Sequence, residues 1–463
     1  MLKGFDPNAI QDKKAREGFI ILLNLVETLK AENERLQVEN QQLRDEINRL
    51  KGEQGKPPFQ GKAKKAAKAD HSSEGERRQL QRREQRKGSK QVKIDREQKV
   101  AVERLELPAD AVFKGYEDVV VQDLEIKTDN VLLRKEKFYS PSEQKTYIAP
   151  NPPGYEGQFG PGIKALVTVF YHGCNMTEPK IVEFLANMNI EISSGQVSNL
   201  LIKKQERFHE EKVDVYRAGL ESSPWQQSDW TGMKVNGENH YCHIVCNPLY
   251  AAYFTKARKD RQTILEVLRN SREREYVLNE QAMLLLEVLT LSRAKRELLQ
   301  NLVSETVYSE SEFFNLLESH DLGPNQRRQV LDASAIAAYH SQQDWPVIDL
   351  LLADDAPEFK LVTTLLALCW VHEGRHYKKL TPFAEHHQQV LDAFLESFWN
   401  YYGKLLAYQQ QPSPERRLEL MTEFERLFSQ ETTYWALNER LALTKDKQAA
   451  LLMVLDHPEI PLH

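Results

Sequence analysis

Two aspartates that close short apolar runs are the residues of this sequence best suited to metal-dependent chemistry. Asp229 lies in the stretch SDWTGMKVNG, and the run from Val347 to Leu352 is followed directly by Asp354 and Asp355. A strand that ends in a carboxylate holds an oxygen ligand on a rigid element, and Mg²⁺ or Mn²⁺ prefers oxygen ligands. The competing interpretation of the second site is a solvated Asp pair that caps the next helix.

The elements around these aspartates indicate an α/β sheet. Residues 224–256 predict three strands, RQTILEVL predicts a helix, and two apolar runs on either side of residues 353–364 predict two more strands. The resulting order, β-β-β-α-β-α-β, is typical of a ribonuclease-H-like sheet. We expect this core over residues 216–382, with a helical insertion at about 270–340.

Asp229 near the middle of the first strand and an Asp at the end of the fourth would lie together in such a core. Two carboxylates there hold two Mg²⁺ ions about 4 Å apart. One ion helps to activate the attacking water or 3′-hydroxyl, and the other stabilises the leaving oxygen. Residues 383–463 predict a helical C-terminal region, whose aromatic stripe at 390–402 has the i, i+3, i+4 spacing of a packing face.

Residues 1–50 contain a leucine repeat that predicts a parallel coiled-coil dimer. The leucines recur every seven residues, and valine, asparagine and isoleucine occupy the other seam positions. A buried Asn pairs with its counterpart and disfavours other registers. The alternative is one amphipathic helix packed on its own domain. The d positions are Leu22, Leu29, Leu36, Leu43 and Leu50, and the a positions are Val26, Asn33, Asn40 and Ile47.

The next three regions suggest DNA as a partner. Residues 51–99 predict a disordered linker with 16 Lys and Arg against seven Asp and Glu, while the whole chain has a net charge of −6. Residues 100–150 alternate like a small β module. Residues 151–215 predict a helix-turn-helix-like region in which Ser193 and Gln196 form a capping box. Its expected exposed, DNA-facing residues are Ser198, Asn199, Lys203 and Lys204.

Composition limits the remaining classes. No apolar run approaches the roughly 20 residues of a membrane helix, and the N-terminus lacks the apolar core of a signal peptide. Four scattered cysteines show no disulfide framework, so we expect a cytoplasmic, bacterial protein that is nucleoid-associated when bound to DNA. His240, Cys242, His243 and Cys246 do not predict a zinc site, because strand alternation places His243 opposite the other three.

Several ordered segments together resemble transposases of the insertion sequence 66 type, and the leucine zipper with its GKPP-containing basic linker fits that family. These segments are GQFGPGIKALV, ISSGQVSNLLIK, SDWTGMKVNG, LLADDAPEFK, LCWVHEGRHYKKL, FWNYYGKLLAYQ and HPEIPLH. The resemblance implies DNA transposition by a DDE mechanism on a ribonuclease-H-like fold. It implies Asp229 as the first catalytic and metal-binding carboxylate and Asp354 as the second, ahead of Asp355. By the same resemblance, Cys369, Trp370, His372 and Arg375 match a C-W-x-H-x-x-R motif beside the site, whose structural alternative is packing.

Two features depart from that family. No cysteine pairs of a zinc module follow the basic linker, and the family's third carboxylate, a Glu beyond an Asn-Asn pair after P-L-H, would follow His463. Glu373 and Glu459 are other acidic residues near the site in sequence. We therefore expect a transposase that binds element ends and target DNA, with other proteins of the element as further partners. The alternative is a catalytically inactive, truncated remnant or split-gene fragment that binds DNA and dimerises. A third hypothesis is a zipper-type regulator without catalysis, which is less consistent with the aspartates.

Overall fold

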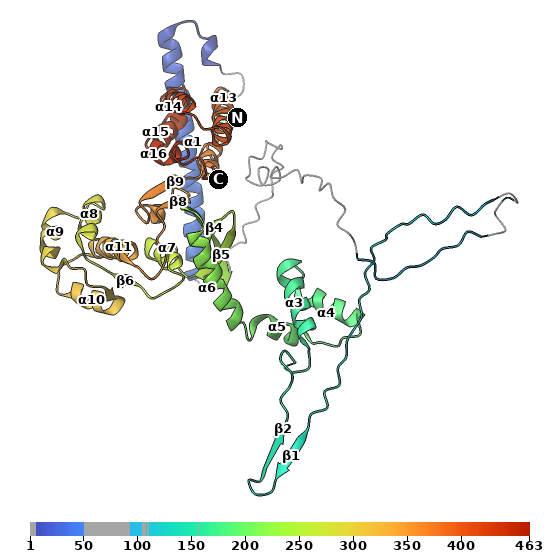
Figure 1. Cartoon of the computed structure of the whole chain (residues 1–463). Coiled ribbons are helices and arrows are strands. Elements are labelled where there is room, and N and C mark those ends of the chain that lie inside the picture. The colour runs from blue at the N-terminus through green and yellow to red at the C-terminus, as the bar shows by residue number, and fades with distance from the viewer. Residues whose placement is uncertain (1–5, 51–92, 104–107, 109–110, 156) are drawn as a thin grey trace. The chain divides into compact units, whose positions relative to one another are not determined.

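The computed structural model describes residues 6–50, 93–103, 108, 111–155 and 157–463, without the side chains of residues 48–50. The chain is a mixed α/β protein with a helical N-terminal part (Figure 1). It divides into two compact units. One comprises Met1–Leu80 together with Lys212–His463, and the other comprises Gln81–Glu211.

A five-stranded mixed sheet lies at the centre of the larger unit. Its spatial order is β5-β4-β3-β8-β9. The first three strands in sequence pair in antiparallel fashion, whereas β8 is parallel to β3 and β9 is parallel to β8. The three strands and the two later apolar strands therefore occur where the sequence predicts them. The bounds are β3 (Trp225–Val235), β4 (Glu238–Asn247), β5 (Tyr250–Lys256), β8 (Leu350–Ala353) and β9 (Leu365–Leu368).

The strand β8, which lies between β3 and β9, divides its side chains between two hydrophobic cores. Leu351 and Ala353 belong to one core, and Leu350 and Leu352 belong to the other. All four are buried. Because both faces of the sheet are covered here, the strand is apolar throughout instead of alternating between apolar and polar residues.

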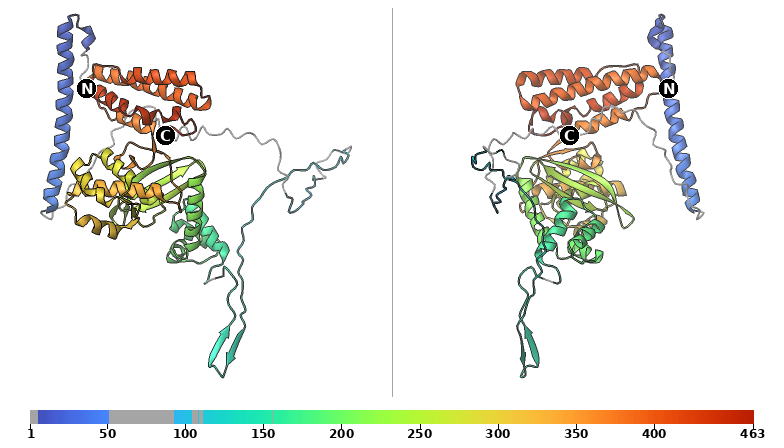
Figure 2. Two further views of the ribbon diagram at one scale, coloured as in Figure 1. Left: turned by 60° about the vertical axis from the view of Figure 1, so that its left-hand side comes forward. Right: turned by 90° about the vertical axis from the view of Figure 1, so that its right-hand side faces the viewer.

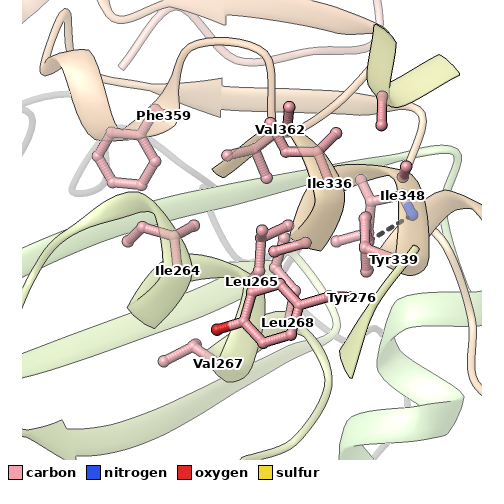
Figure 3. Packing of buried hydrophobic residues seen from close by; sticks show 14 of the residues in the cluster. Ile264, Leu265, Val267, Leu268, Tyr276, Ile336, Tyr339, Ile348, Phe359 and Val362 are labelled. Atoms are coloured by element: carbon pink, nitrogen blue, oxygen red, sulfur yellow. Dashed lines mark hydrogen bonds between the residues drawn. The ribbon is translucent and has the colours of Figure 1, made fainter. Parts of the chain in front are cut away.

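The first core lies between the sheet and the helices α6 (Glu206–Glu221), α7 (Arg261–Leu268) and α11 (Pro324–Ser341). Figure 3 shows Ile264 of α7 near Phe359, and Ile336 of α11 near Val362. The hydroxyl of Tyr339 accepts a hydrogen bond of 2.8 Å from the backbone N–H of Ile348, drawn as the dashed line. This bond fixes the chain just before β8.

The predicted insertion at 270–340 is mostly helical. A two-residue antiparallel pair of strands, which the sequence pattern did not predict, closes it. Tyr276 of this pair stacks on Phe313, with ring centroids 4.9 Å apart. The elements are β6 (Glu275–Tyr276), α8 (Glu280–Val288), α9 (Arg293–Leu299), η4 (Gln300–Leu302), β7 (Tyr308–Ser309), α10 (Glu310–Glu318) and α11.

The second core is built by the C-terminal helices on the other face of the sheet, visible as the orange and red layer in Figure 2. Trp370 is fully buried and packs against Phe398, Tyr401 and Phe424. The aromatic stripe at 390–402 is therefore a packing face, as predicted. The elements are α12 (Trp370–Lys378), α13 (Glu385–Gln410), α14 (Pro414–Phe428), α15 (Trp435–Lys445), α16 (Gln448–Leu451) and η6 (Met453–Leu455).

The leucine repeat lies on one long helix, α1 (Lys13–Leu50), preceded by the short helix η1 (Pro7–Ala9). Its seam side chains from Leu22 to Ile47 are exposed along the chain. The side chain of Leu50 lies outside the described residues. The seam therefore remains open within one copy, and the coiled-coil dimer stays a prediction.

The smaller unit contains the predicted helix-turn-helix-like region. The helices α3 (Pro161–Thr168), η3 (Val169–Gly173), α4 (Glu178–Asn187) and α5 (Ser194–Ile202) surround a small core. Ser193 caps α5, since its hydroxyl accepts from the N–H of Gln196 at 3.2 Å and the Gln196 side chain accepts from the N–H of Ser193 at 3.2 Å. The predicted capping box is therefore confirmed.

Two parts of the chain differ from the expected elements. The connection between β8 and β9 is a single 3₁₀ turn, η5 (Pro357–Phe359), where the predicted order has a helix. Among the described residues of the expected β module, strands form only at β1 (Lys137–Ser140) and β2 (Lys145–Ile148), and residues 111–136 form no regular pairing. Residues 51–92 of the expected linker lie outside the described residues. No helix in the described part is both long and apolar enough to cross a membrane.

Candidate functional site

Asp229 lies on β3, and Asp354 directly follows β8, the strand that pairs with β3 in parallel. Trp225 is paired with Leu350, and the same offset continues through Gln227 and Leu352. Asp229 is two residues beyond Gln227 on β3, and Asp354 is two residues beyond Leu352, just after β8 ends at Ala353. Because side chains alternate along a strand, both aspartates share the face of Leu350 and Leu352. Strand pairing alone therefore brings together two acids that are 125 positions apart in sequence.

A small cavity of about 120 Å³ lies between these aspartates and the first turns of α12. Cys369 precedes α12, and His372 and Arg375 follow at a spacing that places them on one side of the helix. The cavity therefore combines two carboxylates, an imidazole and a guanidinium, the residues singled out from the sequence. Its lining is Gln227, Ser228, Asp229, Leu352, Ala353, Asp354, Cys369, Val371, His372, Arg375 and His463.

Each aspartate uses one carboxylate oxygen in a local backbone hydrogen bond. Asp229 Oδ1 accepts from the N–H of Trp230 at 2.7 Å, and Asp354 Oδ1 accepts from the N–H of Ala356 at 3.0 Å. Among the hydrogen bonds of the described residues, the second oxygen of neither aspartate has a partner. The local bonds fix the carboxylates and leave one oxygen of each for a ligand.

Burial raises the pKa of Asp229 above its ordinary value, and the nearby charge of Asp354 adds to the effect. The N–H of Trp230, His372 and Arg375 act in the opposite direction but do not cancel it. Asp229, buried next to a second acid, therefore resists ionisation. A cation that binds both would relieve that repulsion.

His372 is held as a neutral imidazole. Burial lowers its pKa, and the Arg375 charge lowers it further, against the opposing effect of the two aspartates. Arg375 Nη1 lies 3.0 Å from His372 Nε2. Because a guanidinium can only donate, Nε2 accepts and the proton resides on Nδ1. This Nδ1 is buried and has no hydrogen-bond partner among the described residues.

Asp355 does not line the cavity. It forms an ion pair with Lys447 and lies 3.4 Å from Lys360. Burial alone would raise its pKa, but the two lysines outweigh burial and lower it. Of the Asp pair, Asp354 therefore faces the cavity and Asp355 forms ion pairs outside it.

The two other acids considered near the site also point elsewhere. Glu373 is 3% exposed and is held by Arg440, Thr444 and Lys447, the last at 3.3 Å. Glu459 lies 3.2 Å from His457 Nδ1. Neither lines the cavity. Within the described residues no group of three or more His, Cys, Asp or Glu side chains could hold a metal ion.

The two carboxylates fit Mg²⁺ or Mn²⁺ rather than a softer metal. Mg²⁺ is commonly held by one or two carboxylates, with water and substrate phosphates completing its shell. The free oxygens of Asp229 and Asp354 match that requirement. Cys369 is an unsuitable ligand, because burial raises the pKa of its thiol to about 11.

Sequence reasoning missed two contributors to the cavity, Gln227 and His463, and the lysine that holds Asp355 outside it. Gln227 lies two residues before Asp229, so strand alternation already places it on the same face. It donates to the backbone oxygen of His463 at 3.0 Å, which brings the last residues of the sequence to the cavity. Lys447, the partner of Asp355, has no local sequence signal because the pair joins distant segments.

The residues predicted to face DNA lie in the smaller unit, around the end of α5. Ser198 is half-buried and Asn199 is exposed, both on the helix. Lys203 is the exposed residue that ends α5, and the exposed Lys204 follows with a positive φ of 58°. The two lysines therefore lie beyond the helix and not along one helical face.

Comparisons with known proteins supply a relative but no activity. No protein-family model matches the chain, and no solved structure matches it. It is similar to "Uncharacterized protein y4jO" of Sinorhizobium fredii (strain NBRC 101917 / NGR234). The two are 27% identical over 254 residues, which span 53% of this chain and 76% of that protein. The name of that relative states no activity, so the geometry of the cavity carries the functional argument.

Proposed function

We propose that this chain is a DNA transposase of the DDE type, similar to the insertion sequence 66 family, with a ribonuclease-H-like core. The observation that carries the proposal is that Asp229, on β3, and Asp354, just after the adjacent parallel strand β8, line one cavity. The strand order β5-β4-β3-β8-β9, with three antiparallel strands followed by two parallel ones, supports the same core.

The chain's own residues would act mainly by positioning. The second carboxylate oxygens of Asp229 and Asp354 would hold Mg²⁺ or Mn²⁺, which when bound activates the attacking hydroxyl and stabilises the leaving oxygen. Arg375 brings a positive charge that suits a DNA phosphate. His372 would help to orient Arg375, because its Nε2 accepts a hydrogen bond from the guanidinium.

The remaining parts of the proposal concern DNA and a second copy. The region around α5 would contact element ends, and the basic linker would add contacts to phosphates without sequence readout. The exposed seam of α1 would pair with the α1 of another copy. In this proposal the protein acts on DNA in the bacterial cytoplasm.

One observation favours the alternative of a chain that binds DNA and dimerises without cutting. Among the described residues, only two carboxylates line the cavity, and Glu373 and Glu459 are engaged elsewhere. If the reaction needs a third acid, the described lining does not supply it. Loss of one catalytic group of a set that acts together costs several orders of magnitude in rate.

The test is Mg²⁺-dependent nicking of a plasmid that carries the DNA flanking the gene. The proposal expects nicks near the element ends with the wild-type chain and none with Asp229→Ala. Asp392→Ala, an exposed substitution on α13, should leave nicking unchanged. Retarded but uncut DNA with the wild-type chain would overturn the cleavage proposal and favour the alternative.

A further inference from the structure

The helix α1 has a second contact face beside its leucine seam. Leu22 and Leu29 are 58% and 65% exposed, whereas Leu23 is 5% and Asn24 is 2% exposed. With leucines at heptad position d, Asn24 occupies position f and Glu27 position b. These positions point away from a coiled-coil partner. The seam and the covered face can therefore be occupied at the same time.

Glu27 caps the helix α13 from a distant part of the sequence. Its carboxylate accepts from the N–H of Phe383 at 2.7 and 2.8 Å and from the N–H of Ala384 at 2.8 Å. The helix α13 has no side-chain cap of its own. A negative charge at a helix N-terminus is stabilising, and the Glu27 side chain is only 12% exposed.

Asn24 performs the same task for α15. Its side-chain oxygen accepts from the N–H of Trp435 at 2.9 Å, and its amide donates to the carbonyl of Thr433 at 2.8 Å. The helix α15 also lacks a side-chain cap from its own segment. Lys30 adds a contact on the same side, with Nζ 4.2 Å from the centre of the Phe383 ring.

We propose that α1 is a rigid connector between two copies of this chain. Its seam takes the α1 of the second copy, while Asn24 and Glu27 clamp the helix to α13 and α15 of its own body. This inference rests on the zipper dimer proposed above. It adds that the contacts of α1 with α13 and α15, and not chain connectivity alone, set the distance between the folded bodies of the two copies. The same contacts set the distance between their acidic cavities.

Amide hydrogen exchange of the full chain tests the clamp directly. Glu27→Ala should speed exchange at Phe383 and Ala384 at least about tenfold, because each amide loses its acceptor. Asn24→Ala should do the same at Trp435. Glu34→Ala is the matched control, since Glu34 occupies position b one heptad later and is exposed. It should leave all three amides protected.

The mass and radius of gyration of the same variants test the connector. The proposal expects a dimer in every case, with a larger radius for the dimer of the double variant Asn24→Ala, Glu27→Ala, in which both clamp contacts are removed. Unchanged exchange at Phe383 and Ala384 would overturn the clamp. A monomeric wild-type chain with protected amides would overturn the zipper and the connector while the clamp stands. Failure of DNA nicking bears on neither result.

Discussion

At the scale of single residues, the electrostatic interactions of the site are unfavourable. Asp229 and Asp354 share one face of the sheet, and burial and mutual repulsion raise the pKa of Asp229. When folding raises the pKa of a carboxyl group, it favours the neutral form, so ionisation of that group lowers the free energy of unfolding. Such a site lowers the free energy of unfolding, and binding of a cation would raise it again.

Asp229→Asn should therefore stabilise the fold by about 1 kcal/mol at neutral pH. The gain should vanish below the ordinary pKa of an aspartate, where wild-type Asp229 is neutral in both states, and grow as the pH rises through the raised pKa. Urea unfolding at several pH values measures it. With saturating Mn²⁺ the wild-type chain should become the more stable of the two, because only it gains from the cation. An equal gain for Asp229→Asn would contradict the assignment of Asp229 as a cation ligand.

Loss of charge should affect stability differently at the neighbouring acids Asp354 and Asp355. Asp354→Asn removes a carboxylate beside Asp229, so we expect no loss of stability. Asp355→Asn removes the charge held by Lys447 and Lys360 and should cost about 2 kcal/mol. Urea unfolding of the two variants at neutral pH measures both changes in stability. Equal losses would show that both acids are structural.

The predictability of the site follows from how each residue is placed. Asp229, Asp354, His372 and Arg375 are foreseeable because strand ends and helix turns have fixed spacings. The separation of Asp354 from Asp355 is not, because it depends on Lys447, which reaches Asp355 only after the C-terminal helices have folded. A long-range ion pair leaves no periodic pattern in the sequence.

At the scale of elements, the position of α12 depends on its close contact with α13. A Cβ added at Gly374 would lie 2.7 and 2.8 Å from two atoms of the Trp399 ring, and 3.1 Å from the ring of Phe398. Real Cβ atoms do not approach so closely. Gly374 lies between His372 and Arg375, so its missing side chain lets the helix carry both residues to the cavity.

Gly374→Ala should destabilise the fold by about 1–3 kcal/mol, because either α12 or the Trp399 ring must move. Gly403→Ala is the matched control within α13, where a Cβ meets nothing within 4 Å. It should stabilise by about 0.5–1 kcal/mol through the higher helix propensity of alanine. The urea concentrations at the midpoints of unfolding compare the stabilities of the two variants. A stabilised Gly374→Ala variant would contradict the close packing of α12 on α13.

Elements were predictable where periodicity was strong and less so where pairing is irregular. The strands over 224–256, the aromatic helix at 390–402 and the capping box at Ser193 follow from short-range patterns. The helix expected between β8 and β9 is only a 3₁₀ turn, because Phe359 and Val362 insert into the core from a short connection. The alternation at 111–136 likewise predicts strands, but these residues form no strand pairing with any part of the chain that the structure describes.

At the scale of the whole molecule, the exposed seam of α1 is the main apolar surface that one copy leaves uncovered on this helix. The seam residues Leu29, Leu36 and Leu43 are all exposed. The polar Asn33 and Asn40 interrupt the seam at a positions. This arrangement is typical of a two-stranded parallel coiled coil, in which such asparagines fix the register.

Leu36→Glu should convert a dimer of the full chain into monomers, because it places two like charges face to face in the seam. Val38→Glu is the matched control, since Val38 is also an exposed apolar residue of α1 but occupies position f, away from the seam. It should leave the dimer intact. Light scattering after gel filtration measures both masses. Neither variant should alter protection of the Phe383 amide, because the clamp at Glu27 lies on another face of the helix. A wild-type monomer, or loss of the dimer in both variants, would show that the seam does not pair two copies.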